Sequence, residues 1–138
     1  MSRHRLLSIL AMLVCAIALM HGAAIVFSLY WTLWWYDIVL HFLGGIFIGL
    51  LVLWVRFLSG YFPASSFLWS PGRLFLFTLF WTFIIGVGWE VFEWLAGNTW
   101  SIEGYWLDTT LDVVLDLIGG IAGFLYFIHK HISHDERS

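Results

Sequence analysis

The sequence is poor in charged residues and has a single cysteine. Of its 138 residues, 11% are charged and 62% are apolar, whereas a soluble domain carries about 25% charged residues. This shortage excludes an ordinary soluble domain, because too little polar surface remains to cover one. Six Lys and Arg residues and a formal charge of -3 offer no basic patch for a phosphate backbone, so no nucleic-acid partner is expected. Cys15 alone cannot form an intrachain disulfide.

Four long apolar runs explain this composition. Roughly 20 apolar residues in a helix span about 30 Å of hydrocarbon, and the runs predict transmembrane helices over residues 6–29, 36–58, 74–96 and 109–129. The expected fold class is therefore all-α: a polytopic membrane protein of four transmembrane helices in two hairpins, with one domain over residues 1–138. The first run is longer than the roughly 7–15 residues of a signal-peptide core, which favours an uncleaved helix.

The basic residues predict the orientation of these helices. Threaded alternately through a bilayer, the helices place every Lys and Arg on the side of the two termini. These residues are Arg3, Arg5, Arg56, Arg73, Lys130 and Arg137. The opposite segments, 30–37 and 97–108, contain neither residue type and are rich in Trp. Because cytoplasmic loops carry the excess of Lys and Arg, the pattern predicts cytoplasmic N and C termini.

Two of the expected helices resemble each other. The segment Asp37-Ile-Val-Leu-His41 aligns with Asp112-Val-Val-Leu-Asp116, and a pair of glycines follows each segment. Both helices run in the same direction, so a duplication would be a parallel repeat of two hairpins about an axis along the membrane normal. The alternative is chance similarity between two apolar spans. In each of these helices, two glycines have the spacing that allows close approach of another helix, which favours placing the polar residues of the helix on its packed side rather than toward lipid. These glycines are Gly45, Gly49, Gly119 and Gly123.

Most carboxylates fall in the half of the predicted membrane that has no Lys or Arg. Four titratable residues lie deep in the expected helices: His41, Glu90, Asp112 and Asp116. Four acids lie nearer the interface, where water could solvate them: Asp37, Glu93, Glu103 and Asp108. An ionised carboxylate in the bilayer centre costs about 2.5–3.5 kcal/mol on insertion scales. Because this half has no basic side chain, the negative charge of these carboxylates could be neutralised by a bound metal or by shared protons, or stabilised by water from the outer face.

The side-chain types indicate which metal and which roles to expect. Carboxylates with one or two imidazoles suit a divalent cation: Mg²⁺, Mn²⁺ or Ca²⁺, with Zn²⁺ possible through His41. The candidate ligands are His41, Glu90, Asp108, Asp112 and Asp116, and the candidate general bases are Glu93 and Asp37. His21 is more typical of a hydrogen-bonded packing residue. The tail residues His129, His131, His134 and Asp135 are more typical of a solvated end than of a metal site.

The polar motifs also resemble a known group of proteins. The pattern Asp37-x-x-x-His41-Phe, Trp89-Glu90-x-x-Glu93 and Asp108-x-x-x-Asp112-x-x-x-Asp116-x-x-Gly119-Gly120 is similar to small bacterial inner-membrane proteins of the YjdF type. More loosely, it resembles the VanZ-like family, which is linked to glycopeptide-antibiotic resistance. The resemblance covers residues 34–125 and implies a multi-pass protein of the bacterial inner membrane. VanZ-like proteins usually have Lys, Gln and Asn where this chain has Ile38, Glu93 and Asp116, so the present site is more anionic and the resemblance names no reaction.

Three functions remain open from the sequence. The first is a metal-dependent envelope enzyme acting on a lipid or lipid-linked substrate. The second is a cation or proton pathway, since acids within a membrane often mark ion routes, although the other half of the membrane has no matching acids. The third is an accessory or structural subunit of a homo-oligomer or larger membrane complex, surrounded by lipids.

Overall fold

The fold consists of four long helices and one short one. The computed structural model describes residues 3–62, 70–97 and 104–135, with side chains up to residue 130. The elements are α1 (Arg3–Phe27), α2 (Leu29–Thr32), α3 (Tyr36–Phe57), α4 (Pro71–Ala96) and α5 (Tyr105–Asp135). Glu103 and the side chains of His131, His134 and Asp135 lie outside the described residues. The four long helices are each long and apolar enough to cross a membrane, which confirms the predicted all-helical fold.

Local backbone chemistry sets the helix ends. Helix α1 ends at Phe27 rather than at residue 29, because Ser28 adopts a left-handed conformation (φ 56°) and α2 follows at once. Helix α4 begins at Pro71, three residues before the apolar run. Proline suits a first helical turn, and the Ser70 hydroxyl accepts a hydrogen bond from the Arg73 backbone N–H (3.4 Å). Gly97 (φ 72°) ends α4. Hydropathy does not register these caps, so the ends of these helices differ by a few residues from the ends of the apolar runs.

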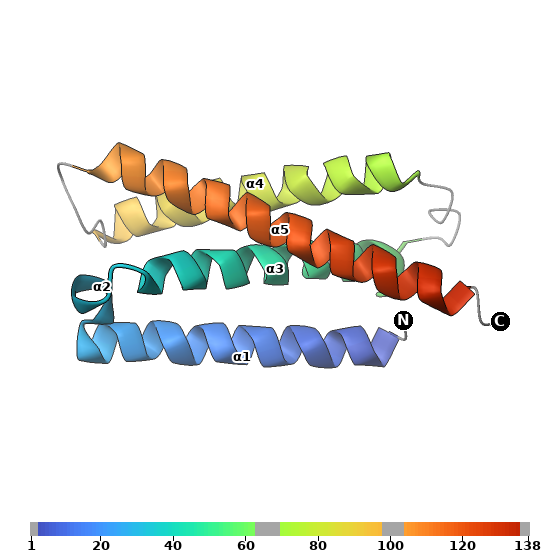
Figure 1. Ribbon diagram of the computed structural model, residues 1–138, viewed down its shortest axis with the longest axis horizontal. Helices are drawn as coiled ribbons and strands as arrows, with labels where there is room; N and C mark the ends of the chain where they lie inside the picture. Colours follow the sequence, from blue (N-terminus) through green and yellow to red (C-terminus); the bar gives the residue numbers. More distant parts are fainter. Residues whose placement is uncertain (1–2, 63–69, 98–103, 136–138) are drawn as a thin grey trace.

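The long helices alternate in direction. Helices α1 and α4 run one way and α3 and α5 the other, and the N and C termini lie at the same end of the molecule (Figure 1). Helix α3 packs most extensively against α5 and also contacts α1 and α4. Helix α3 is therefore the central element, and α1 reaches the rest of the molecule mainly through it.

Glycines bring α3 and α5 into close contact. A Cβ added to Gly45 would collide with the carbonyl oxygen of Asp116, and a Cβ added to Gly119 would collide with that of Phe42. The same type of contact joins Gly49 to the backbone of Gly120, at 2.9 Å from an added Cβ. These contacts confirm the prediction that the glycine spacing marks a packed helix face. They also place next to each other the polar residues that lie about one turn before these glycines in each helix.

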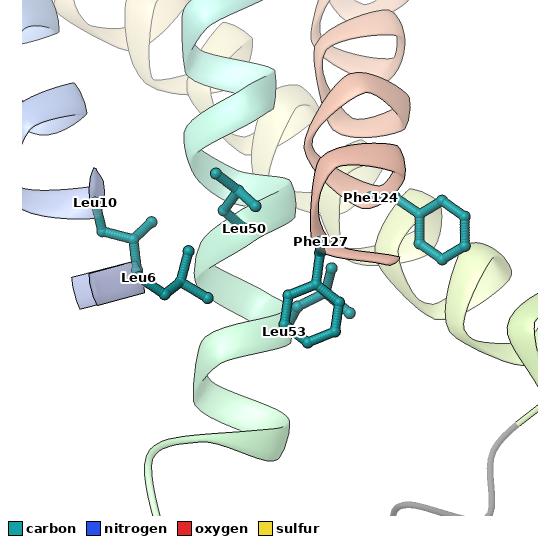
Figure 2. Close-up of a cluster of buried hydrophobic side chains, with 6 residues drawn as sticks. All are labelled: Leu6, Leu10, Leu50, Leu53, Phe124 and Phe127. Carbon is teal, nitrogen blue, oxygen red and sulfur yellow. The ribbon is translucent and has the colours of Figure 1, made fainter. Parts of the chain in front are cut away.

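Two apolar clusters hold α1 against the bundle. One, near the termini, joins α1 to α3 and α5 (Figure 2), and its buried members are Leu6, Leu10, Leu50, Leu53, Phe124 and Phe127. The other lies near the opposite end and contains Ala24, Tyr36 and Leu40. There the Tyr36 hydroxyl donates a hydrogen bond to the Met20 carbonyl oxygen (3.0 Å). Helix α1 is thus fixed at both ends.

Candidate metal centre

The imidazole of His41 lies at the centre of a group of carboxylates from three helices. Its Nε2 atom is 3.7 Å from Asp37 Oδ1, 3.8 Å from Asp112 Oδ1 and 3.9 Å from Glu90 Oε1. Helix periodicity explains the first distance, because residues four apart share a helix face. The parallel packing of α3 on α5 explains the second, and α4 supplies the third. The predicted meeting of acids from different spans is therefore present in the structure.

The other ring nitrogen of His41 faces Asp116. The distance from His41 Nδ1 to Asp116 Oδ1 is 3.4 Å. Two glycines make room for this carboxylate: Gly45 packs on the Asp116 backbone, and a Cβ on Gly86 of α4 would lie 2.5 Å from Asp116 Oδ2. Asp116 and His41 occupy equivalent positions in the predicted repeat, so the paired positions meet across the α3–α5 interface.

Helix α4 contributes Glu90 and Glu93. Glu90 is 6% exposed, and although Thr109 hydrogen-bonds to its carboxylate, its Oε1 atom is buried without a hydrogen-bond partner among the described residues. A buried carboxylate oxygen without a partner is costly. Glu93 is half-buried, and one of its oxygens lies within 4.8 Å of ligand atoms of both His41 and Glu90. The unpartnered Glu90 oxygen therefore points to a cation or a proton in this group.

The His41 cluster is defined here as His41, Asp37, Glu90, Glu93, Asp112 and Asp116. Potential ligand atoms converge within 4.8 Å in two overlapping sets that share His41: one adds Asp37 and Asp112, the other Glu90 and Glu93. The cluster could therefore hold a metal ion. Asp108 lies one turn before Asp112 and is only half-buried. It belongs to neither convergent set, although its carboxylate interacts electrostatically with those of Asp37 and Asp112.

The separations around Nε2 bear on what the cluster can bind. Distances of 3.7–3.9 Å are too long for hydrogen bonds. Two ligand atoms of one cation are about this far apart when each metal–ligand bond is about 2.1 Å long and the ligand–metal–ligand angle is wide. The sequence also has no Lys or Arg between Arg5 and Arg56 or between Arg73 and Lys130. A fixed cationic side chain is therefore absent from the part of each helix that carries the cluster.

A cavity of about 730 Å³ adjoins the cluster. Its lining includes Asp37, His41, Glu93 and Asp116 together with apolar side chains of α1, α3 and α4. At its polar end, the Tyr30 hydroxyl and His21 Nδ1 form a hydrogen bond of 2.6 Å. Burial raises the pKa of the Tyr30 phenol, and the neighbouring Asp37 and Glu93 carboxylates raise this pKa further. His21 also contacts Trp89 edge to face, with ring centroids 6.1 Å apart, in keeping with its expected packing role.

Two contributors to this site were not predicted from the sequence: Tyr30, which hydrogen-bonds to His21, and Gly86, which packs on the Asp116 carboxylate. A signal for Gly86 was present. Along α4 the buried residues follow a four-residue spacing: Thr78, Thr82, Gly86 and Glu90. A stripe of small and polar residues that ends in a glutamate marks the helix face that packs against α5.

Comparison with known proteins assigns a family. Searches of the curated proteins and of the solved structures each found no match to this chain. Residues 2–132 match the family model described as "Predicted membrane protein (DUF2238)". This match covers nearly the whole chain and agrees with the four candidate spans. The protein is therefore a multi-pass membrane protein and belongs to the DUF2238 family of predicted membrane proteins.

Proposed function

We propose that this protein is a divalent-cation-dependent membrane enzyme that acts on a lipid or lipid-linked substrate of the bacterial envelope. The observation that carries the proposal is the arrangement around His41 Nε2. Carboxylates of three helices lie 3.7–3.9 Å from this atom, and the helix segments that carry them contain no Lys or Arg to neutralise them. Acids inside a membrane segment are costly unless they are paired or coordinate an ion.

We assign as metal ligands His41 Nε2 and the three carboxylates whose oxygens lie 3.7–3.9 Å from it, those of Asp37, Asp112 and Glu90. This assignment takes Asp37 and Asp112 from one convergent set and Glu90 from the other, and it gives Asp37 the role of ligand in place of general base. Asp116 faces Nδ1 instead, so its role is to orient the imidazole by accepting a hydrogen bond from the Nδ1–H group. Asp108 is left out of the ligand set, because it lies outside both convergent groups.

The ligand types favour a hard cation. One imidazole and three carboxylates suit Mn²⁺, Mg²⁺ or Ca²⁺ better than Zn²⁺, whose sites usually contain more nitrogen or sulfur ligands. Bundle proteins build comparable sites from inward-facing carboxylates and histidines on adjacent helices.

The chemistry proposed for this site is hydrolysis of a phosphoryl or ester bond. The cation would polarise the phosphoryl or carbonyl oxygen and bind the attacking water. Glu93, half-buried beside His41 and Glu90, would take the proton of that water. The water oxygen bonds to phosphorus or to the carbonyl carbon, the bond to the leaving oxygen breaks, and the proton passes from Glu93 to that oxygen.

The cellular setting of the proposal rests on the sequence. The segregation of Lys and Arg predicts that the His41 cluster belongs to the outer half of the inner membrane. The resemblance to YjdF-type and VanZ-like proteins supports a role in the bacterial envelope. A substrate reaching the cluster would therefore be a component of the outer leaflet.

Lipid analysis of cells that express matched variants tests this function. Asp112→Asn and Glu90→Gln should abolish any change in envelope lipids that the wild-type protein causes when it is expressed in a strain lacking it. Asp108→Asn is the control, because it removes an acid of the same helix that is not in the proposed ligand set. The proposal is wrong if Asp112→Asn and Glu90→Gln fold, bind metal like wild type and leave the lipid profile at the wild-type pattern.

A further inference from the structure

The cavity beside the His41 cluster has one polar and one apolar end. The polar end carries Asp37, His41, Glu93 and Asp116, and the apolar end is lined by Val14, Phe47 and Ile48. Its volume of about 730 Å³ falls within the roughly 300–1,000 Å³ of small-molecule sites. The proposed enzymatic function requires the polar end but does not explain the apolar one.

The depth of the cavity matches one leaflet of a bilayer. Along α3 its lining runs from Asp37 to Ile48, which is about 16 Å at about 1.5 Å per residue. Half of a hydrocarbon core is about 15 Å. The cavity therefore extends from the level of the interfacial residues at the start of α3 to the middle of the membrane, and the His41 cluster lies in the part of the cavity nearer the start of α3.

The cavity borders a space between α1 and α4. Within the described part of the chain, no Cα atom of α1 lies within 8 Å of one in α4. The two helices approach at the polar end, where His21 meets the ring of Trp89. On either side of Trp89 along α4, lining residues remain exposed: Ile85 by 39% and Phe92 by 55%. In a transmembrane bundle, the surroundings of these side chains are lipid.

From these observations we infer that the cavity binds the acyl chain of a lipid, with the lipid headgroup at the His41 cluster. The lipid would come from the leaflet that contains the cluster and pass sideways between α1 and α4. This inference rests on the proposed function and names its substrate class: a lipid whose chain lies within one leaflet, rather than a water-soluble phosphate or ester.

Two glycines provide a matched test. Gly88 lines the cavity and Gly22 does not, yet both are exposed helical glycines at which an added Cβ would meet nothing within 4 Å. Gly88→Leu should fill part of the cavity, and Gly22→Leu should leave it unchanged. Ala18→Phe, from the α1 wall, is a second cavity-filling variant in case Gly88→Leu does not fold.

The probe is a phosphatidylglycerol with a photoreactive diazirine near the end of its acyl chain, in nanodiscs of phosphatidylethanolamine and phosphatidylglycerol. After irradiation, mass spectrometry should find adducts on Val14, Phe47 or Ile48 of the wild-type protein. Labelling of these residues should fall several-fold in Gly88→Leu or Ala18→Phe and stay at the wild-type level in Gly22→Leu. Adducts confined to lipid-facing residues such as Leu19 and Leu125, or equal labelling in all variants, would overturn the inference.

Metal binding measured on the same samples separates the two proposals. If wild type binds a divalent cation but the cavity takes no lipid adducts, the acyl-chain inference fails and the metal site stands. If the cavity is labelled as expected but no divalent cation binds, the lipid site stands and the proposed enzyme fails.

Discussion

The Nδ1 atom of His41 lies 3.4 Å from the Oδ1 atom of Asp116, across the interface of two parallel helices. Glycines determine this contact, because Gly45 and Gly86 leave no Cβ in the space that Asp116 occupies. A carboxylate beside Nδ1 holds the ring proton there and leaves the Nε2 lone pair directed at the other carboxylates. The pair thus orients the proposed metal ligand, and its consequences can be measured.

Removing Asp116 should weaken metal binding without abolishing it. Loss of an orienting partner of a metal-bound histidine typically costs about 10–100-fold in affinity. Titration of the detergent-purified protein with Mn²⁺ should therefore show an affinity lower by about this factor for Asp116→Ala, with an unchanged number of sites. An unaltered affinity in Asp116→Ala would contradict the orienting role, and complete loss of the site would make Asp116 a direct ligand.

A methyl group at the α3–α5 contact should destabilise the fold. Gly45→Ala and Gly119→Ala each place a Cβ against the backbone of the facing helix, and overpacking of a close contact costs about 1–3 kcal/mol. Gly22→Ala is the control, because nothing lies within 4 Å of its added Cβ. Thermal unfolding in detergent should show lower midpoints for the first two variants only. Equal midpoints for Gly45→Ala, Gly119→Ala and Gly22→Ala would mean that α3 and α5 do not pack as described.

Cysteine labelling tests the predicted orientation. In a Cys15→Ser background, a cysteine at Trp34 should react with a membrane-impermeant maleimide applied to intact spheroplasts, because this residue is 82% exposed at the end of the bundle away from the termini. A cysteine at Ser70, before α4, should react only after the membrane is opened. The reverse pattern would place the His41 cluster in the cytoplasmic half.

Tyr30 should make stability sensitive to alkaline pH. The phenol has a pKa above its usual 10.0, mainly because it is buried, so the unfolded chain loses this proton first as the pH rises. The contribution of Tyr30 is complete below pH 10 and declines above it. The free energy of unfolding of wild type should therefore fall more steeply above pH 10 than that of Tyr30→Phe. Parallel pH profiles of the two proteins would contradict the buried, protonated phenol.

The sequence was sufficient to predict the four long helices, because apolar runs of membrane length have few other interpretations. The sequence also placed Asp37, His41, Glu90, Asp112 and Asp116 in the same half of the membrane. The sequence did not show which of these side chains contact one another across neighbouring helices. Spacing puts Asp108, Asp112 and Asp116 on one face of a helix. Only the packing of α3 and α4 shows that Asp112 faces Nε2, that Asp116 faces Nδ1 and that Asp108 belongs to neither convergent set.

Helix ends and small residues were the other gap. The left-handed Ser28 and the capping Ser70 decide where α1 ends and where α4 begins, and neither is visible to hydropathy. Gly86 has no polar side chain, so the pattern of titratable residues in the sequence does not indicate that it belongs to the site. Its contribution is the absence of a side chain beside the Asp116 carboxylate, which requires knowledge of the neighbouring helix.

The central claim is that the carboxylates around His41 Nε2 hold a divalent cation. Elemental analysis of the purified protein, followed by equilibrium binding of Mn²⁺ to chelator-stripped samples, tests it most directly. The account predicts about one divalent ion per wild-type chain, little or none in an Asp112→Asn/Glu90→Gln double variant, and wild-type binding in Asp108→Asn. A folded wild-type protein that carries no divalent metal and takes up neither Mn²⁺, Mg²⁺, Ca²⁺ nor Zn²⁺ would contradict it.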